Sequence, residues 1–287
     1  SVHESSHSID PKITLLVNQM VIDYPNESKA HSIQGDYYLR AENDDAALKA
    51  YKRALELDKS VFAIWNQVLI MEYQAKLFSE LYVDGKECAS LFPTNTTVAL
   101  LYGVAANQMG KHNEAIDVLS VGIEMIINDK RMEAEFFGQL GEAYFGISDI
   151  KKGKENYAKA VQLDAFSGLL KNNYAYRLAL AKVDLELALS LSQQAMTGSP
   201  THAQFIDTYG FVLFQKGDYA KAKVEYEKAC AIDENDKAIV EHMGDAFFKT
   251  GNVHEAIIWW EKAKKLNSSN KNLEKKILEK KYYEPQF

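Results

Sequence analysis

Proline, glycine and long apolar runs are all scarce in this chain. Only five prolines and fifteen glycines occur in 287 residues, and common helix formers such as Ala, Leu, Lys and Glu are frequent. This balance favours helix over sheet. No apolar segment approaches the roughly 20 residues that span a bilayer, and no signal-peptide core is present. We expect a helical, soluble chain, either cytoplasmic or, if an upstream signal has been removed, periplasmic or envelope-associated.

An excess of positive charge is also lacking. The formal net charge is −7, whereas binding to nucleic acid needs a dense basic surface. Basic residues concentrate near the C-terminus, where residues 261–281 hold eight Lys and three Glu. The rest of the chain is therefore more acidic than the total suggests, and we expect no nucleic-acid partner.

Motifs for catalysis and metal binding are missing as well. The sequence has no P-loop, no HExxH and no Cys-x-x-Cys, and His254-Glu255 is followed by no second metal ligand. Acidic residues 42–45 and 233–236 lack the spacing of a calcium loop and are expected to cap helices. Cys88 and Cys230 lie far apart and are expected on buried helix faces without a disulfide. We expect no enzyme, no cofactor and no metal.

What the chain does have is an internal repeat of small residues. The repeated position, which we call the crossing slot, falls at residues 35, 69, 103, 141, 175, 210 and 244. It holds glycine in similar local contexts, except for Leu69 and Ala175, and its successive spacings are 34, 34, 38, 34, 35 and 34. Two antiparallel helices approach closely only where the side chains at their crossing are small. The period therefore predicts a series of helix pairs.

The second half of each unit keeps the same register. About twelve residues after the glycine slot comes a small residue, four residues later a large one, and three later another small one. The large residues are Tyr51, Leu119, Tyr157, Tyr226 and Trp260. Gly110, Gly217 and Gly251 are expected to provide the left-handed residue that ends the first helix of a pair.

These units resemble the tetratricopeptide repeat family, most closely at DTYGFVLFQKGDYAKAKVEYEKA and EHMGDAFFKTGNVHEAIIWWEKA, in the style of bacterial scaffold proteins. The resemblance implies an all-α, right-handed superhelical solenoid of antiparallel helix pairs. Residues 1–10 are predicted as an N-terminal tail, residues 11–270 as the array and residues 271–287 as a capping helix and tail. The array begins with a half repeat and continues with seven repeats near 28–61, 62–95, 96–132, 133–167, 168–202, 203–236 and 237–270.

Irregular spacing and the two ends of the array carry further predictions. Four extra residues near 125–133 are expected to lengthen a second helix or its exit and to divide the groove into two arcs. Residues 13–25 match only the second half of a repeat, so we expect further repeats before residue 1, an apolar face around Ile13, Leu16 and Met20, and homo-oligomerisation through that face. At the other end, Leu273, Ile277 and Leu278 are expected to form the apolar side of the cap.

The resemblance also implies a peptide-binding groove lined by the first helix of each pair. The groove candidates lie near the crossing slot: Asn66, Tyr73, Asn107, Glu142, Asn172, Asn173, Tyr176, Asp207, Phe211 and Glu241, with Ser32, Asp36 and Asp245 in equivalent positions. Asn can clamp a peptide backbone because it donates and accepts at once, and Tyr176 and Phe211 are expected side by side as apolar anchors. Alternatively, the amides satisfy local backbone groups and the acids are only solvated.

The leading hypothesis is therefore a non-enzymatic scaffold that binds an extended peptide or partner protein in this groove. Few cations lie among the candidate positions, so the partner segment is expected to be neutral or basic. One alternative is a self-assembly module that makes contacts through its end faces. The other is an accessory or regulatory domain of a larger envelope or cytoplasmic complex.

Overall fold

The computed structural model describes residues 11–266 and 271–284, and within these ranges the chain forms sixteen α-helices and no strand. The predicted all-α class is confirmed for this part of the chain. No helix in it is long and apolar enough to cross a membrane. The local sequence signals agree with this outcome, since helix formers dominate and glycines such as Gly110, Gly217 and Gly251 fall between helices.

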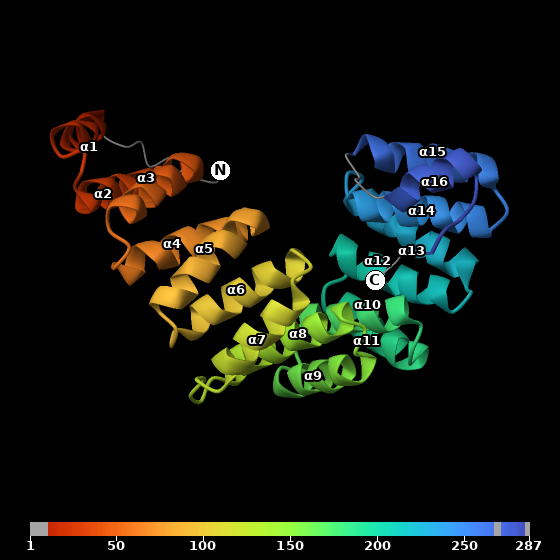
Figure 1. The fold of residues 1–287 in the computed structure, drawn as a ribbon. Coiled ribbons are helices and arrows are strands. Elements are labelled where there is room, and N and C mark those ends of the chain that lie inside the picture. The colour runs from red at the N-terminus through yellow and green to blue at the C-terminus, as the bar shows by residue number, and fades with distance from the viewer. Residues whose placement is uncertain (1–10, 267–270, 285–287) are drawn as a thin grey trace, which may run out of the picture. The chain divides into compact units, whose positions relative to one another are not determined.

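The chain divides into two compact units, one ending at Ile127 and the other starting at Asn128 (Figure 1). The first unit contains α1 (Pro11–Asp23), α2 (Ser28–Arg40), α3 (Asp44–Leu57), α4 (Phe62–Gln74), α5 (Phe78–Leu91), α6 (Thr96–Gln108) and α7 (His112–Ile123). The second contains α8 (Lys130–Gly146), α9 (Ile150–Leu163), α10 (Gly168–Ala181), α11 (Leu185–Gly198), α12 (Ala203–Gln215), α13 (Tyr219–Ile232), α14 (Lys237–Lys249), α15 (Val253–Lys265) and α16 (Lys271–Glu279).

Consecutive helices pack in pairs inside each unit, such as α2 with α3 and α14 with α15. Six of the seven predicted repeat ranges contain one complete pair, and the range 133–167 misses the first three residues of α8, which begins at Lys130. The extra residues near position 125 do not lengthen the second helix α7, which has 12 residues. They extend the segment before α8 and α8 itself, which has 17 residues where the other first helices have 13 or 14.

The crossing glycines lie directly beneath the large residue of the second helix in the same repeat. A Cβ added at Gly244 would lie 2.4 Å from Trp260 Cδ1, and one at Gly141 would lie 2.6 Å from the Tyr157 ring. The same relation joins Gly35 to Tyr51, Gly103 to Leu119 and Gly210 to Tyr226. The large residue of the second helix is therefore the residue that requires the glycine.

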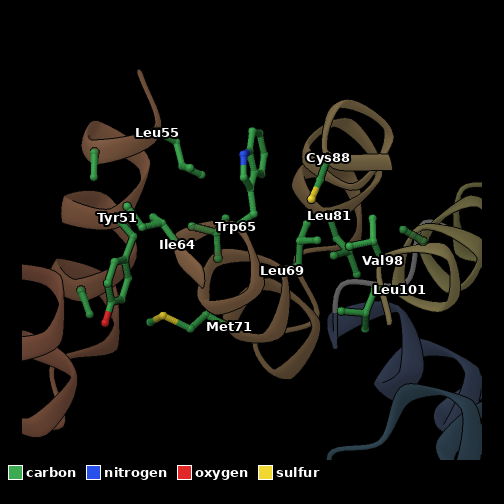
Figure 2. Close-up of a cluster of buried hydrophobic side chains, with 14 residues drawn as sticks. Tyr51, Leu55, Ile64, Trp65, Leu69, Met71, Leu81, Cys88, Val98 and Leu101 are labelled. Carbon is green, nitrogen blue, oxygen red and sulfur yellow. The ribbon is translucent and has the colours of Figure 1, made fainter. Parts of the chain in front are cut away.

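The core of the first unit runs through several helices of that unit. Figure 2 shows Tyr51 and Leu55 from α3, Trp65 and Leu69 from α4 and Cys88 from α5 among its buried side chains. Cys88 is fully buried as predicted, whereas Cys230 is only partly buried. The core of this unit therefore runs from one helix pair to the next rather than forming one central body.

Turns and caps follow the predicted chemistry. Gly110, Gly217 and Gly251 have φ values of +68°, +89° and +89°, which is the left-handed region that favours glycine. Asp236 Oδ1 accepts hydrogen bonds from the backbone N–H groups of Ala238 and Ile239 at 2.8 and 3.2 Å. The acidic stretch before α14 is therefore a helix cap.

The two ends differ from each other. On α1, Leu15, Leu16 and Ile22 are each about 70% exposed, and Ile13 is 48% exposed, as expected for a helix that lacks a packed neighbour on one side. At the other end α16 covers α14 and α15 through Leu273 and Ile277.

Leu278 is 80% exposed and does not pack with Leu273 and Ile277. The prediction that it lies on the apolar side of the capping helix is therefore wrong. It stands 34 residues after Gly244, at the crossing slot. The residues described after α16 form no second helix that could pack on it.

Candidate functional site

The candidate groove residues lie on the first helices, where the crossing glycine fixes which side chains face the second helix and which face outward. In the first unit, Asn66 is half-buried and Tyr73 is 45% exposed, so both can be reached from solvent. Asn107 is buried, and its Oδ1 lies 3.3 Å from His112 Nδ1 on the next helix. This contact favours the local structural role for Asn107.

A cavity of about 420 Å³ lies between α2 and α4 in the first unit. Its lining comprises Ser28, Lys29, Ser32, Asp36, Tyr51, Asp58, Val61, Ala63, Ile64 and Gln67. Ser32 and Asp36 are groove positions expected from the sequence, whereas Gln67 takes the place expected for Asn66. Two carboxylates and one Lys give the lining a net negative charge, which suits a neutral or basic segment.

In three repeats the acid after the crossing glycine binds the large ring of the second helix. Tyr51 donates its hydroxyl to Asp36 Oδ1 at 2.6 Å, and Tyr157 donates to Glu142 Oε2 at 2.9 Å. Trp260 Nε1 donates to Asp245 Oδ1 at 2.8 Å. These acids therefore have a structural task that the groove prediction missed. The signal was available, because acid and ring lie fifteen residues apart in each of these repeats.

Glu142 also forms an ion pair with the next repeat. Arg177 Nε donates to Glu142 Oε2 at 2.8 Å, and the guanidinium contacts the other carboxylate oxygen too, so the pair is bidentate. Burial lowers the pKa of Arg177, but guanidinium groups stay charged at any ordinary pH. This pair joins α8 to α10 and leaves Glu142 little freedom to bind a partner.

Tyr176, Phe211 and His242 form a stack across three first helices, α10, α12 and α14. The ring centroids of Tyr176 and Phe211 lie 5.3 Å apart, so the two aromatics are side by side as expected. The His242 ring stacks on Phe211 at 5.2 Å. Phe211 is only 2% exposed, because these neighbours cover it. A ligand would reach this cluster through the half-buried Tyr176.

His242 is held in its charged form by an acid of the preceding repeat. Its Nδ1 lies 2.8 Å from Asp207 Oδ1. Burial alone lowers the pKa of His242, but the charge and hydrogen bond of Asp207, with Asp245 and Glu241 nearby, raise it to about 9. Asp207 is buried and committed to this pair.

The amide pair on α10 has one unused acceptor. Asn172 is 7% exposed and its Nδ2 donates to Asn173 Oδ1 at 3.4 Å. Its own Oδ1 accepts no hydrogen bond from the described part of the chain. A buried acceptor without a partner is costly, so Asn172 carries an unsatisfied polar atom within α10.

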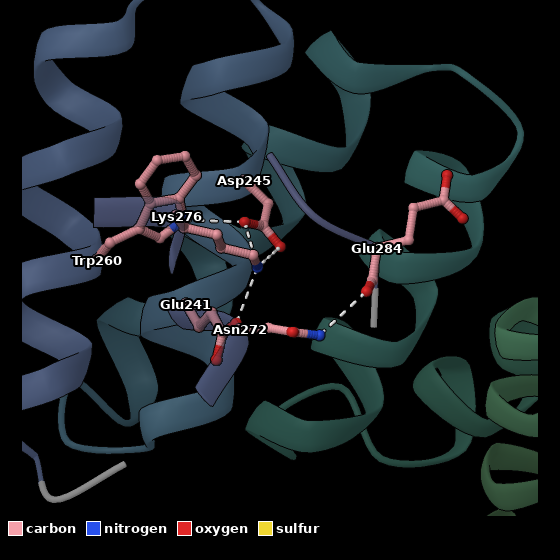
Figure 3. A network of polar contacts seen from close by, with 6 residues as sticks. All are labelled: Glu241, Asp245, Trp260, Asn272, Lys276 and Glu284. Carbon is pink, nitrogen blue, oxygen red and sulfur yellow. Dashed lines mark hydrogen bonds and ion pairs between the residues drawn. The ribbon is translucent and has the colours of Figure 1, made fainter. Parts of the chain in front are cut away.

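Glu241 and Asp245 share one lysine from α16, as Figure 3 shows. Lys276 Nζ lies 2.8 Å from Glu241 Oε1 and 2.7 Å from Asp245 Oδ1, and the residue is only 2% exposed. Burial on its own lowers the pKa of Lys276, but the two carboxylates raise it overall. The basic helix α16 thus contributes one buried cation to the chain's own groove candidates.

The Glu241–Lys276 pair repeats the Asp207–His242 pair one repeat later, since both span 35 residues. The helix α16 therefore occupies the place of the first helix of a further repeat, and Lys276 takes the position of His242.

Models of tetratricopeptide repeats match residues 15–61, 134–166 and 210–251. Together with the helix pairs and crossing glycines, these matches decide the family. The chain belongs to the tetratricopeptide repeat family. Proteins of this family and fold are generally non-enzymatic scaffolds for protein–protein interaction.

Two curated proteins are similar to this tetratricopeptide repeat chain. Mouse Superkiller complex protein 3 is 23% identical over 260 residues, which cover 89% of this chain and 14% of that protein. The bovine BBSome complex member BBS4 is 25% identical over 165 residues, which cover 56% of this chain and 30% of that protein. The chain therefore spans less than a third of the length of either relative.

Solved structures show the same fold at low sequence identity. A tetratricopeptide repeat protein from Parabacteroides merdae aligns with a TM-score of 0.71 and 11% identity, covering 88% of this chain and 98% of that one. Yeast Tom70 aligns with a TM-score of 0.61 and 14% identity, covering 94% and 57%. The APC/C hetero-tetramer Cut9–Hcn1 aligns with a TM-score of 0.66 and 12% identity, covering 94% and 52%.

Proposed function

We propose that this chain is a non-enzymatic scaffold that binds an extended, neutral or basic segment of a partner protein along its first helices. The observation that carries this proposal is the cavity between α2 and α4, which the predicted groove positions Ser32 and Asp36 help to line. Its polar rim of Ser32, Asp36 and Gln67 offers donors and acceptors for a peptide backbone.

The remaining candidates support different parts of this role. Asn66 and Tyr73 lie on α4, the helix that also lines the cavity, and both are accessible to solvent, so they can extend the contact surface. In the second unit, Asn172 has an Oδ1 that accepts no hydrogen bond from the described residues, and Tyr176 has a ring that is half-buried and can be reached from solvent. Glu142, Asp207 and Glu241 are already paired with cations of this chain, so they shape the surface rather than bind the partner directly.

The test places a large side chain in the cavity and compares the peptide affinity of this variant with that of a variant that carries the same substitution outside the cavity. Peptides are selected from a random extended library against the whole chain, and their affinity is then measured for Ser32→Trp. We expect at least about a tenfold loss, equivalent to roughly 1.4 kcal/mol, because the indole occupies the peptide's place. Ser79→Trp, on the exposed surface of α5, should bind like the parent chain.

Failure to select any peptide would contradict the proposal. So would peptides that bind Ser32→Trp and the parent chain equally well. Circular dichroism of both Trp variants shows whether either change has disturbed the helices.

A second candidate function, self-assembly through an end face, is favoured by one observation. The exposed apolar side chains of α1, among them Leu15 and Leu16, lie where a preceding helix would pack. Under this alternative, sedimentation of Leu16→Glu would show a smaller oligomer than the parent chain, and Ser32→Trp would leave the oligomer unchanged.

A further inference from the structure

The C-terminal tail, residues 280–284, lies against the C-terminal ends of the first helices α10, α12 and α14. Lys280 has φ +52° and ends α16, after which Lys281 N donates to Lys276 O at 3.3 Å. Three residues after Lys281, Glu284 forms an ion pair with Lys182, the residue that caps α10. The tail thus runs from the seventh repeat to the fifth.

Tyr282 of this tail occupies a defined pocket. Its ring centroid lies 5.6 Å from that of Phe214 at the end of α12. Lys249 Nζ, at the end of α14, lies 4.4 Å from the Tyr282 centroid and 5.5 Å from that of Tyr219. Burial, followed by the charges of Asp245 and Glu284, raises the pKa of Tyr282. Aromatic stacking and cation–π contacts hold the ring.

We refer to Phe214, Tyr219, Lys249 and Lys182 as the tail pocket. It offers an aromatic floor with Lys249 over the ring, where Lys276 Nζ also lies 5.4 Å from the ring centroid, and with Lys182 facing the acid two residues further along the bound chain. Lysines at the C-terminal ends of helices are already favoured by the helix dipole. Here Lys249 lies over the aromatic ring and Lys182 pairs with the acid. The pocket therefore suits a segment that carries an aromatic residue two positions before an acid.

The hold of the tail on this pocket is modest. The Lys182 and Glu284 side chains are 45% and 56% exposed, and ion pairs at such exposed positions contribute little. Besides this pair, Asn272 Nδ2 donates a 3.4 Å hydrogen bond to the Glu284 backbone oxygen, and the Tyr282 ring, which packs against the cluster around Phe214, is the main anchor. A short segment held mainly by one side chain can be exchanged for a similar segment of another protein.

We propose that the tail pocket is a docking site for a partner segment with an aromatic residue two positions before an acid, and that the tail occupies it until such a segment displaces it. This inference rests on the proposed function in assuming that the chain binds protein segments. It adds a second site with its own partner chemistry, away from the cavity in the first unit.

The test uses a fluorescent peptide with the sequence of residues 278–286, LEKKYYEPQ, and the full chain. Fluorescence anisotropy should show at least about tenfold tighter binding to Tyr282→Ala than to the parent chain, because the variant no longer fills its own pocket. Tyr283→Ala is the matched control. The Tyr283 hydroxyl contacts only Glu279 of α16 in the bonds described here, so its loss should leave the affinity unchanged.

Two further changes separate displacement from unfolding. Glu284→Lys removes the exposed ion pair and should strengthen peptide binding several-fold. Lys249→Glu combined with Tyr282→Ala should cancel the gain in peptide affinity, because it reverses the charge over the ring.

Equal peptide affinity for the parent chain, Tyr282→Ala and Glu284→Lys would overturn the inference. If library peptides still bind in a Ser32-dependent manner, only this inference fails. If they do not bind either, the proposed function fails too.

Discussion

At the scale of single residues, the close contact between glycine and ring is the feature that determines the helix pair. At Gly244 an added Cβ would meet Trp260 at 2.4 Å and the backbone oxygen of Ala256 at 3.1 Å. Neither group can move freely, since Trp260 is fully buried and hydrogen-bonded to Asp245.

Gly244→Ala should therefore destabilise the chain by about 1–3 kcal/mol, the usual cost of overpacking, despite a gain of about 1 kcal/mol in helix propensity. Urea denaturation followed by circular dichroism measures the change. Gly198→Ala is the control, because no atom lies within 4 Å of the added Cβ. It should be neutral or stabilising. Equal destabilisation by both changes would contradict the role assigned to the crossing glycine.

A second residue-scale feature is the buried acid Glu72 in the first unit. Lys52 Nζ lies 2.6 Å from Glu72 Oε1 and 2.9 Å from Asp84 Oδ2, so one cation serves two carboxylates. Burial, followed by the hydrogen bond with Asp84, raises the pKa of Glu72 to about 8, although Lys52 acts to lower it. A raised pKa in the folded state means that the protonated form is favoured there. The resulting stability is present at low pH and is lost as pH rises through about 8.

Glu72→Gln, which mimics the protonated acid, should therefore have about the same free energy of unfolding as the parent chain at pH 5. At pH 9 it should be the more stable of the two. Urea midpoints at both pH values measure this difference. A variant that is less stable than the parent at pH 9 would show that the Lys52 ion pair outweighs the burial of Glu72.

At the scale of elements, α16 is attached by one buried cation as much as by apolar contacts. Removing Lys276 would leave Glu241 and Asp245 beside each other without their shared partner. Breaking a buried ion pair in this way typically costs about 3–5 kcal/mol. The local consequence should be separation of α16 from α14.

Lys276→Ala should thus lower stability by an amount in this range and speed amide hydrogen exchange in α14 and α16. Lys275→Ala, at the neighbouring exposed position, should change stability by less than about 0.5 kcal/mol. Adding Asp245→Asn to Lys276→Ala should recover part of the loss. No recovery would indicate that Lys276 acts mainly through the packing of its hydrocarbon chain.

The elements were largely predictable because their signals are local and repeated. Glycine spacing located the helix pairs, and Gly217 and Gly251 marked turns that the structure shows in left-handed backbone. Side-chain partners were less predictable, because they depend on neighbours about 35 residues away. Glu142, Asp207 and Glu241 read as free groove acids until Arg177, His242 and Lys276 were seen beside them. Lys276 itself looked like a solvated residue on a basic helix.

At the scale of the whole molecule, two compact units each stack helix pairs, and we propose a different partner surface on each. The first unit has the cavity between α2 and α4, with a net negative lining. The second has groove acids neutralised by its own cations and an inner edge occupied by its tail. A scaffold of this kind can hold different segments at different repeats, which repeat proteins achieve by varying surface residues on a constant packing pattern.

The central claim is that an extended partner segment lies along the first helices of the first unit. Hydrogen exchange of the whole chain, with and without a selected peptide, tests it most directly. We predict slower exchange in α2 and α4 when the peptide is bound, and no such change with Ser32→Trp. Protection confined to α1 or to the second helices α3 and α5 would contradict the claim.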